Sequence, residues 1–277
     1  MIRKSCVLLL GWAAVLGLLA PALHTIWVSF SPDSFLTPPT NIWSFKWYVA
    51  FARDQRWINA ILQSLLVASL SAALSVALAA PAAWSINKLP QDNQRWLSIL
   101  LLLPALVPPA ALGFGLLPLV YWTHLWGTTL GIVLVHATVG LPIAFLMIRT
   151  CLAQQLSELE SAAAGLGASQ WEVWRRVTLP LLSPVLMATG TVVFVLSLNE
   201  SLVSIFLATP TNETLPAVVW PQLRYSPNPM VAVASCITAV VGMSGVLIAF
   251  QLIRFRVETR IPMSGGPDSR SRHAKIR

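Results

Sequence analysis

The chain has 277 residues, of which 56% are hydrophobic and only 10% are charged, and its mean hydropathy is +0.71. A water-soluble domain carries about 25% charged residues, so this composition excludes an ordinary soluble enzyme and points to a chain that folds in lipid. The formal net charge is +8, but only one aromatic residue, Phe255, lies among the basic C-terminal residues and no nucleic-acid-binding motif is present, so we expect no nucleic-acid partner.

Six segments almost free of ionisable side chains each reach the ~20 residues that a helix needs to cross hydrocarbon. They are Cys6–Phe30, Ile58–Ile86, Trp96–Leu119, Thr129–Ile148, Leu181–Ala208 and Met230–Ile253. A backbone in lipid must satisfy its own N–H and C=O groups, and these segments lack the alternation of a barrel strand. We therefore predict an all-α polytopic membrane protein with six transmembrane helices. The first segment is too long for the core of a cleaved secretory signal and is interpreted as a retained helix.

Basic residues predict the orientation of these helices. The chain has 18 Lys and Arg residues, and 14 of them flank the predicted helices on the side of the membrane that also holds both termini. The opposite side has only four, which are Lys46, Arg53, Arg56 and Arg224. By the positive-inside rule the richer side is cytoplasmic, which predicts a multi-pass membrane protein with both termini in the cytoplasm. We divide the chain into a first helix with its external segment (1–57), a core of five transmembrane helices (58–254) and a basic cytoplasmic tail (255–277). The tail is expected to rest on anionic lipid headgroups.

Two stretches interrupt the apolar pattern in the first half of the chain. The external segment Ser31–Trp57 contains the aromatic-rich stretch Ile42–Phe51, which is typical of an interfacial helix that anchors the chain at headgroup depth. The third transmembrane segment contains Pro104, Pro108 and Pro109, each of which removes a backbone donor and must kink or interrupt the helix. Such a break either lines a transport pathway or fits neighbouring helices, and the sequence leaves both interpretations open.

Residues 150–180 form the only long connection predicted between helices on the cytoplasmic side. Glu158–Ala164 is predicted to be a short helix, Gly165–Gly167 a turn where glycine permits positive φ, and Ser169 the N-cap of a second helix, Gln170–Val177. Two short helices joined by a glycine turn would make a compact projection suited to the groove of a partner protein.

This connection resembles the signature of the inner-membrane permeases of binding-protein-dependent ABC importers, written as EAA, three residues, G, nine residues, I, any residue, LP. The spacing is complete from Ala162 and Ala163 through Gly167 to Pro180, which begins the fifth transmembrane segment. The glutamate position is occupied by Ser161, and Glu158 or Glu160 would have to replace the missing carboxylate. The resemblance also implies a location in the bacterial inner (cytoplasmic) membrane. The resemblance implies a type I importer fold and a coupling loop that docks in a cleft of an ATPase subunit. The residues implicated in docking are Glu158, Glu160, Ser161, Ala162, Ala163, Gly167, Ala168, Ser169 and Pro180.

The chain has no G-x-x-x-x-G-K-[ST] phosphate loop, so we expect no enzyme activity, no catalytic residue and no cofactor bound by this chain. The resemblance implies that ATP and Mg bind two copies of a separate ABC ATPase subunit. It also implies a second, related permease chain in a heterodimer and an extracytoplasmic solute-binding protein. Cys6, Cys151 and Cys236 fall in or beside membrane segments without a CxxC pair and are interpreted as packing residues, so no metal site is indicated.

The end of the fifth segment and the stretch Trp220–Pro229 look like the corresponding parts of spermidine/putrescine permeases. This likeness implies a polyamine solute, with another small amine, an aminophosphonate, ferric ion or thiamine as alternatives. Arg224 and Tyr225 are candidates for contact with the binding protein, or are interfacial anchors. The candidate residues of the solute pathway are Ser197, Asn199, Glu200 and Ser201.

Glu200 also stands out without any family likeness, because a carboxylate inside an apolar crossing costs several kcal/mol unless it faces a polar cavity, is paired or is neutralised. It either attracts a cationic solute or makes a structural hydrogen bond to a neighbouring helix. His24 and His136 are expected to make helix-packing hydrogen bonds. An ion-coupled secondary transporter would need several such carboxylates and internal repeats, and a membrane enzyme would need a catalytic set that is not visible.

Overall fold

A computed structural model describes residues 2–40, 42–155 and 157–260, and the predicted tail residues 261–277 lie outside it. Helices make up the described part of the chain, which contains no β-strand, as the all-α prediction requires. In chain order the helices are α1 (Ile2–Val28), α2 (Lys46–Arg53), α3 (Gln55–Ile86), α4 (Gln91–Leu106), α5 (Pro109–Trp122), α6 (Thr129–Gln155), α7 (Ser157–Gly165), α8 (Gln170–Val173), the π-helical turn η1 (Trp174–Thr178), α9 (Leu179–Asn199), α10 (Leu202–Leu207), α11 (Leu215–Tyr225) and α12 (Pro229–Arg260).

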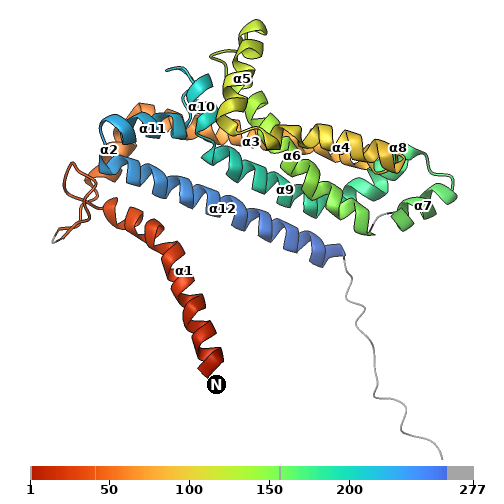
Figure 1. Ribbon diagram of the computed structural model, residues 1–277, viewed down its shortest axis with the longest axis horizontal. Helices are drawn as coiled ribbons and strands as arrows, with labels where there is room; N and C mark the ends of the chain where they lie inside the picture. The colour runs from red at the N-terminus through yellow and green to blue at the C-terminus, as the bar shows by residue number, and fades with distance from the viewer. Residues whose placement is uncertain (1, 41, 156, 261–277) are drawn as a thin grey trace, which may run out of the picture.

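The core of the bundle is formed by α3, α6 and α9, with α12 alongside them (Figure 1). Small residues let these helices approach closely, as is usual in lipid. The hydroxyl of Ser75 in α3 donates to the carbonyl of Ala137 in α6 at 3.2 Å. A Cβ on Gly140 would lie 2.5 Å from a methyl group of Val193 in α9, so only glycine fits where the three helices meet.

Five helices are long and apolar enough to cross a membrane, or six if the bent pair α4 and α5 counts as one span. The pair bends by 102° where Val107 has an extended backbone and Pro108 and Pro109 follow. The third segment, Trp96–Leu119, whose prolines were predicted to kink or interrupt the helix, is interrupted and forms two helices at nearly a right angle. Two successive residues that lack a backbone N–H remove the hydrogen bonds that would keep the helix straight.

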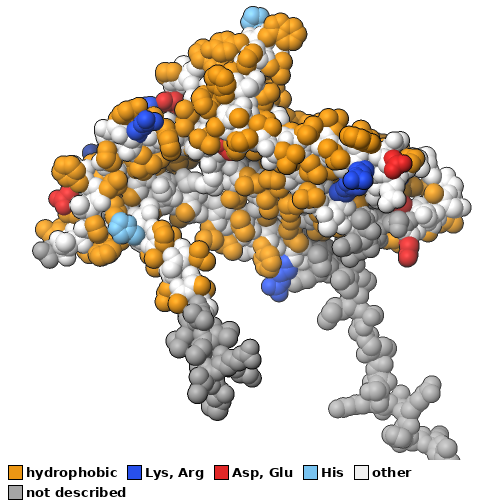
Figure 2. All heavy atoms as spheres, viewed as in Figure 1, with side chains coloured by type: hydrophobic (Ala, Val, Ile, Leu, Met, Phe, Trp, Pro, Cys, Tyr) orange, Lys and Arg blue, Asp and Glu red, His pale blue; other side chains and the backbone are white. Residues whose placement is uncertain are grey.

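Apolar side chains cover much of the visible surface, and most of the charged side chains in this view lie toward the left and right ends of the molecule (Figure 2). This distribution matches a lipid-facing belt between two aqueous faces. Helix α1 diverges from the bundle toward its N-terminus (Figure 1) and exposes apolar side chains such as Trp12 and Leu18. The interfacial helix expected over Ile42–Phe51 begins at Lys46 instead, and Phe45 and Tyr48 pack their rings against Phe30.

The fifth transmembrane segment differs from its prediction at both ends. Helical backbone runs from Gln170 through η1 into α9, so Pro180 lies within a continuous helix and does not begin a new one. The wider π turn directly before Pro180 accommodates a residue without an N–H. At the other end α9 stops at Asn199, and the expected crossing over Leu181–Ala208 ends there, because Glu200 has an extended backbone and a separate helix α10 follows.

Candidate functional site

Residues 157–178, which comprise α7, α8 and η1 and are called here the α7–α8 projection, lie at one end of the bundle. Helices α2 and α11 lie at the opposite end (Figure 1). The two groups of loops that the charge pattern assigned to opposite membrane faces are therefore separated by the length of the helices.

The turn inside the projection is built as the glycine pattern predicted. The N–H of Gly167 donates to Ala164 O at 2.9 Å, and the N–H of Ala168 donates to Ala163 O at 3.2 Å, which satisfies carbonyls at the end of α7. Gly167 has a φ of +90°, which disfavours any residue with a Cβ. The chain reverses direction here at low conformational cost.

Ser169 caps α8, as predicted. Its hydroxyl accepts the N–H of Glu172, and the carboxylate of Glu172 accepts the Ser169 N–H at 3.0 Å, which completes a capping box. The Ser169 N–H and hydroxyl, together with the positive charge of Arg176, hold the pKa of the Glu172 carboxyl below its ordinary value. The projection therefore presents a well-capped helix start to solvent.

The two glutamates proposed to replace the missing signature carboxylate have different surroundings. Glu158 is exposed. The side chain of Glu160 is only 16% exposed, and its Oε1 accepts the indole N–H of Trp84 in α3 at 2.9 Å and the hydroxyl of Thr178. The remaining docking candidates are solvent-accessible, with Ser161, Ala162, Gly167 and Ser169 exposed and Ala163, Ala168 and Pro180 half-buried.

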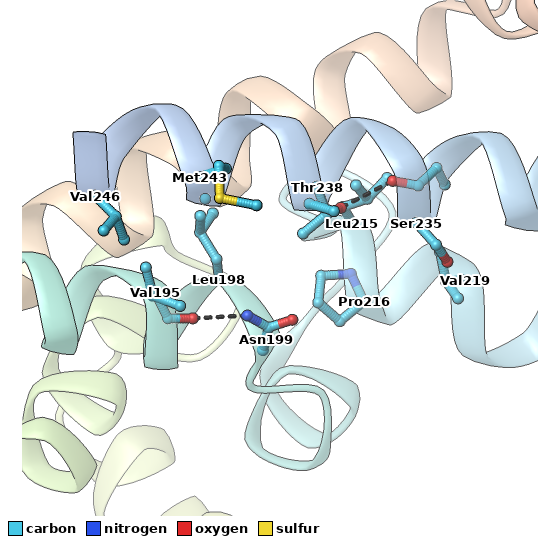
Figure 3. Close-up of a pocket in the computed structure, with 13 residues that line it drawn as sticks. Val195, Leu198, Asn199, Leu215, Pro216, Val219, Ser235, Thr238, Met243 and Val246 are labelled. Carbon is cyan, nitrogen blue, oxygen red and sulfur yellow. Dashed lines mark hydrogen bonds between the residues drawn. The ribbon is translucent and has the colours of Figure 1, made fainter. Parts of the chain in front are cut away.

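A groove of about 450 Å³ lies toward the opposite half of the molecule, between α9, α11 and α12 (Figure 3). Asn199 and Pro216 form one side of it, and Thr238 and Ser235 of α12 face them. The hydroxyl of Thr238 donates to Ala234 O at 2.9 Å, and that of Ser235 donates to Val231 O at 3.0 Å. Because their only protons are used in this way, both hydroxyls offer lone pairs to the groove.

Of the four predicted pathway residues, only Asn199 lines this groove. Glu200 lies at the break between α9 and α10, where its Oε1 accepts the N–H groups of Leu202 at 3.0 Å and Val203 at 3.2 Å. Its hydrogen bonds thus go to the start of α10, the helix that directly follows the break, and attraction of a cationic solute stays a prediction. Ser201 precedes α10 at the same break.

Ser197 is buried and belongs to a polar network centred on His136 of α6. The imidazole Nδ1 lies 2.8 Å from Ser197 Oγ, and Nε2 lies 3.1 Å from Ser204 Oγ. Ser204 donates its own proton to Glu200 O, so in the uncharged ring Nε2–H donates to Ser204 and Nδ1 accepts from Ser197. The packing hydrogen bond expected for His136 is confirmed, and it ties both sides of the α9–α10 break to α6.

Arg224 and Tyr225 end α11 and are exposed, at the end of the molecule that also carries α2. A bidentate ion pair that was not predicted joins the start of α3 to the segment before α11. Arg56 at the start of α3 donates through Nε and Nη2, each at 2.7 Å, to Glu213 before α11. Sequence reasoning counted Arg56 only as a topology charge, because ion pairing across 157 residues leaves no local signal.

Sequence reasoning also missed three residues, two that line the groove of Figure 3 and one that contacts the α7–α8 projection. Ser235 and Thr238 are spaced three residues apart on α12, a helical spacing that would have placed both hydroxyls on one face. Lys88 was counted only as a topology charge, yet it lies 3.5 Å from Glu160.

The helical bundle, its small-residue core and the projection between α6 and α9 define a membrane permease. Residues 75–258 match the family described as binding-protein-dependent transport system inner membrane component. This is more than half of the chain, and the chain therefore belongs to that family, as the signature spacing implied.

Individual relatives refine this assignment. The chain is 28% identical to the putrescine transport system permease protein PotI of Escherichia coli, over 91% of each chain. It is 26% identical to the spermidine/putrescine transport system permease protein PotC of the same organism, over 75% of this chain and 78% of that relative. Its fold is similar to a chain from the crystal structure of a bacterial ABC transporter involved in the import of alginate, with a TM-score of 0.69 at 16% identity over 91% of this chain and 95% of that one.

Proposed function

We propose that the chain is the transmembrane permease subunit of an ATP-driven importer for a polyamine of the putrescine or spermidine kind, delivered by an extracytoplasmic solute-binding protein. Membership of the permease family and the names of the two relatives support this assignment. A second, related permease completes the pathway, and two ATPase subunits bind ATP and Mg.

The observation that carries the coupling role is the α7–α8 projection. It is a compact, glycine-turned pair of helices, and η1 continues directly into the transmembrane helix α9. A displacement of the projection by an ATPase would reach the membrane as a rigid-body movement of helices. In this proposal the projection lies in the cytoplasm together with both termini, in agreement with the charge pattern.

The groove of Figure 3 supports a cationic amine as the solute. Ser235 and Thr238 turn lone pairs toward it, and Asn199 uses an amide N–H on Val195 O at 2.8 Å, which leaves its amide oxygen as an acceptor. A protonated primary amine has three N–H donors and no acceptor, so these groups complement it. Within the assembled transporter this groove would face the pathway shared with the second permease.

The test is uptake by proteoliposomes that contain this chain, the second permease and the ATPase subunits, with the binding protein outside. We expect ATP-dependent accumulation of labelled putrescine or spermidine, and a cross-link from Ser169→Cys to an ATPase subunit but none from Tyr225→Cys. Accumulation of an aminophosphonate, thiamine or ferric ion instead would overturn the polyamine assignment. Uptake driven by an ion gradient without the ATPase would overturn the importer class.

A further inference from the structure

The α7–α8 projection is fastened to the end of α3 by a cluster of polar and aromatic side chains, called here the Glu160 clasp: Trp84, Lys88, Glu160, Gln170, Trp174 and Thr178. Both oxygens of the Glu160 carboxylate are engaged within the chain. Oε1 accepts from Trp84 and Thr178, and Oε2 lies 3.5 Å from Lys88 Nζ.

Lys88 extends the clasp to α8. Its ammonium group donates to Gln170 Oε1 at 2.6 Å and lies 3.7 Å from the ring centroid of Trp84. The Trp84 ring in turn packs against Trp174 of η1, with 4.9 Å between ring centroids. Side chains near the end of α3 therefore contact α7, α8 and η1 simultaneously.

The position of the carboxylate explains this arrangement. Successive residues on a helix are rotated by about 100°, so the one-residue shift from Ser161 to Glu160 changes the direction of the side chain. Ser161 is exposed, whereas Glu160 turns toward the bundle and is largely buried. A largely buried carboxylate whose two oxygens both contact groups of its own chain is poorly placed to reach a second protein, whereas the exposed Glu158 is better placed to do so.

We propose that Glu160 is a positioning residue that transmits movement of the projection to α3 through Trp84 and Lys88, and does not contact the ATPase. Helix α3 has 32 residues and packs along α6 and α9, so a pull on its end is delivered to the centre of the bundle. This inference rests on the proposed coupling role of the projection. In this proposal, movement of the projection reaches the membrane helices by two routes: through the clasp to α3, and through the continuous backbone from η1 into α9.

The test uses the complete transporter in proteoliposomes and measures ATP hydrolysis and solute uptake in the same sample. Glu160→Ala removes the carboxylate, and Trp84→Phe removes one hydrogen bond but keeps an aromatic ring beside Trp174 and Lys88. Asp92→Ala is the matched control, since it removes an exposed carboxylate from the first turn of α4, outside the α7–α8 projection and the clasp. We expect both clasp variants to retain their ATPase subunits but to transport about fivefold less solute per ATP hydrolysed, and the control to behave as wild type.

Two results would contradict the proposal, and a third would overturn the proposed function on which it rests. Loss of the ATPase subunits from Glu160→Ala alone would make Glu160 a docking contact, and the proposed coupling role of the projection would still stand. An unchanged ratio of uptake to hydrolysis in Trp84→Phe would show that the clasp does not transmit movement, and this variant decides the matter if the Glu160→Ala chain does not fold. Absence of any cross-link between Ser169→Cys and an ATPase in the wild-type background would instead overturn the proposed function itself.

Discussion

At the scale of single residues, the side chains of His136 and Glu200 stabilise the break between α9 and α10. His136 is 2% exposed and reaches a hydroxyl on each side of that break. Glu200, at the break, caps the start of α10. These bonds replace the backbone hydrogen bonds that a continuous helix would make through Glu200 and Ser201, which is the condition for irregular backbone within a membrane protein.

We expect His136→Leu to destabilise the bundle by about 1–3 kcal/mol, because Ser197 would lose its partner while still buried. The measurement is the thermal unfolding midpoint in detergent. Thr138→Val is the control, since its hydroxyl bonds only to the carbonyl of Leu134 on its own helix. A midpoint that falls equally in both variants would show that the imidazole bridge contributes nothing of its own.

Glu200→Gln separates the charge of Glu200 from its capping role. The amide oxygen of glutamine can still accept the N–H groups of Leu202 and Val203, so thermal stability should be retained. Uptake of a cationic solute should fall severalfold if the negative charge attracts it. Unchanged uptake would leave the cap as the role of this side chain, and Glu200→Ala should then lower stability.

At the scale of elements, the projection depends on one backbone conformation. Gly167→Pro would force φ to about −65° in place of +90° and remove the N–H donated to Ala164 O. We expect this variant to insert into the membrane and to lose solute-stimulated ATPase activity. Gly165→Ala is the control, because Gly165 has open space around it and no positive φ. Normal coupling in Gly167→Pro would count directly against the docking role.

The transmembrane elements were largely predictable, and so was an interruption near the prolines of the third segment, but the size of that bend and the end of α9 were not. Long apolar runs identify helices such as α3, α6 and α12 because each must satisfy its backbone within lipid. The turn at Gly167 and the cap at Ser169 were also predictable, since φ and side-chain capping are local properties. The 102° bend after Leu106 and the end of α9 at Asn199 depend on what neighbouring helices offer the freed backbone.

At the scale of the whole molecule, the charge pattern predicts which face lies inside. In a variant without native cysteines, Ser169→Cys should react with an impermeant thiol reagent only when the reagent reaches the cytoplasmic side. Tyr225→Cys should react only from the outside, since both side chains are exposed at opposite ends of the bundle. Labelling of both from one side would contradict the six-span topology.

The sequence by itself determined the helical class, the lipid environment, the family and the glycine-turned projection. Each of these properties depends on the composition of a segment or on the spacing of residues that are close together in the sequence, so it can be predicted without the fold. Only the tertiary structure decided which glutamate turns inward and that His136 spans the α9–α10 break. It also brought Asn199 beside Ser235 and Thr238. These three features involve residues that lie tens of positions apart in the sequence. Such residues come together through the packing of whole helices, which local sequence preference does not determine.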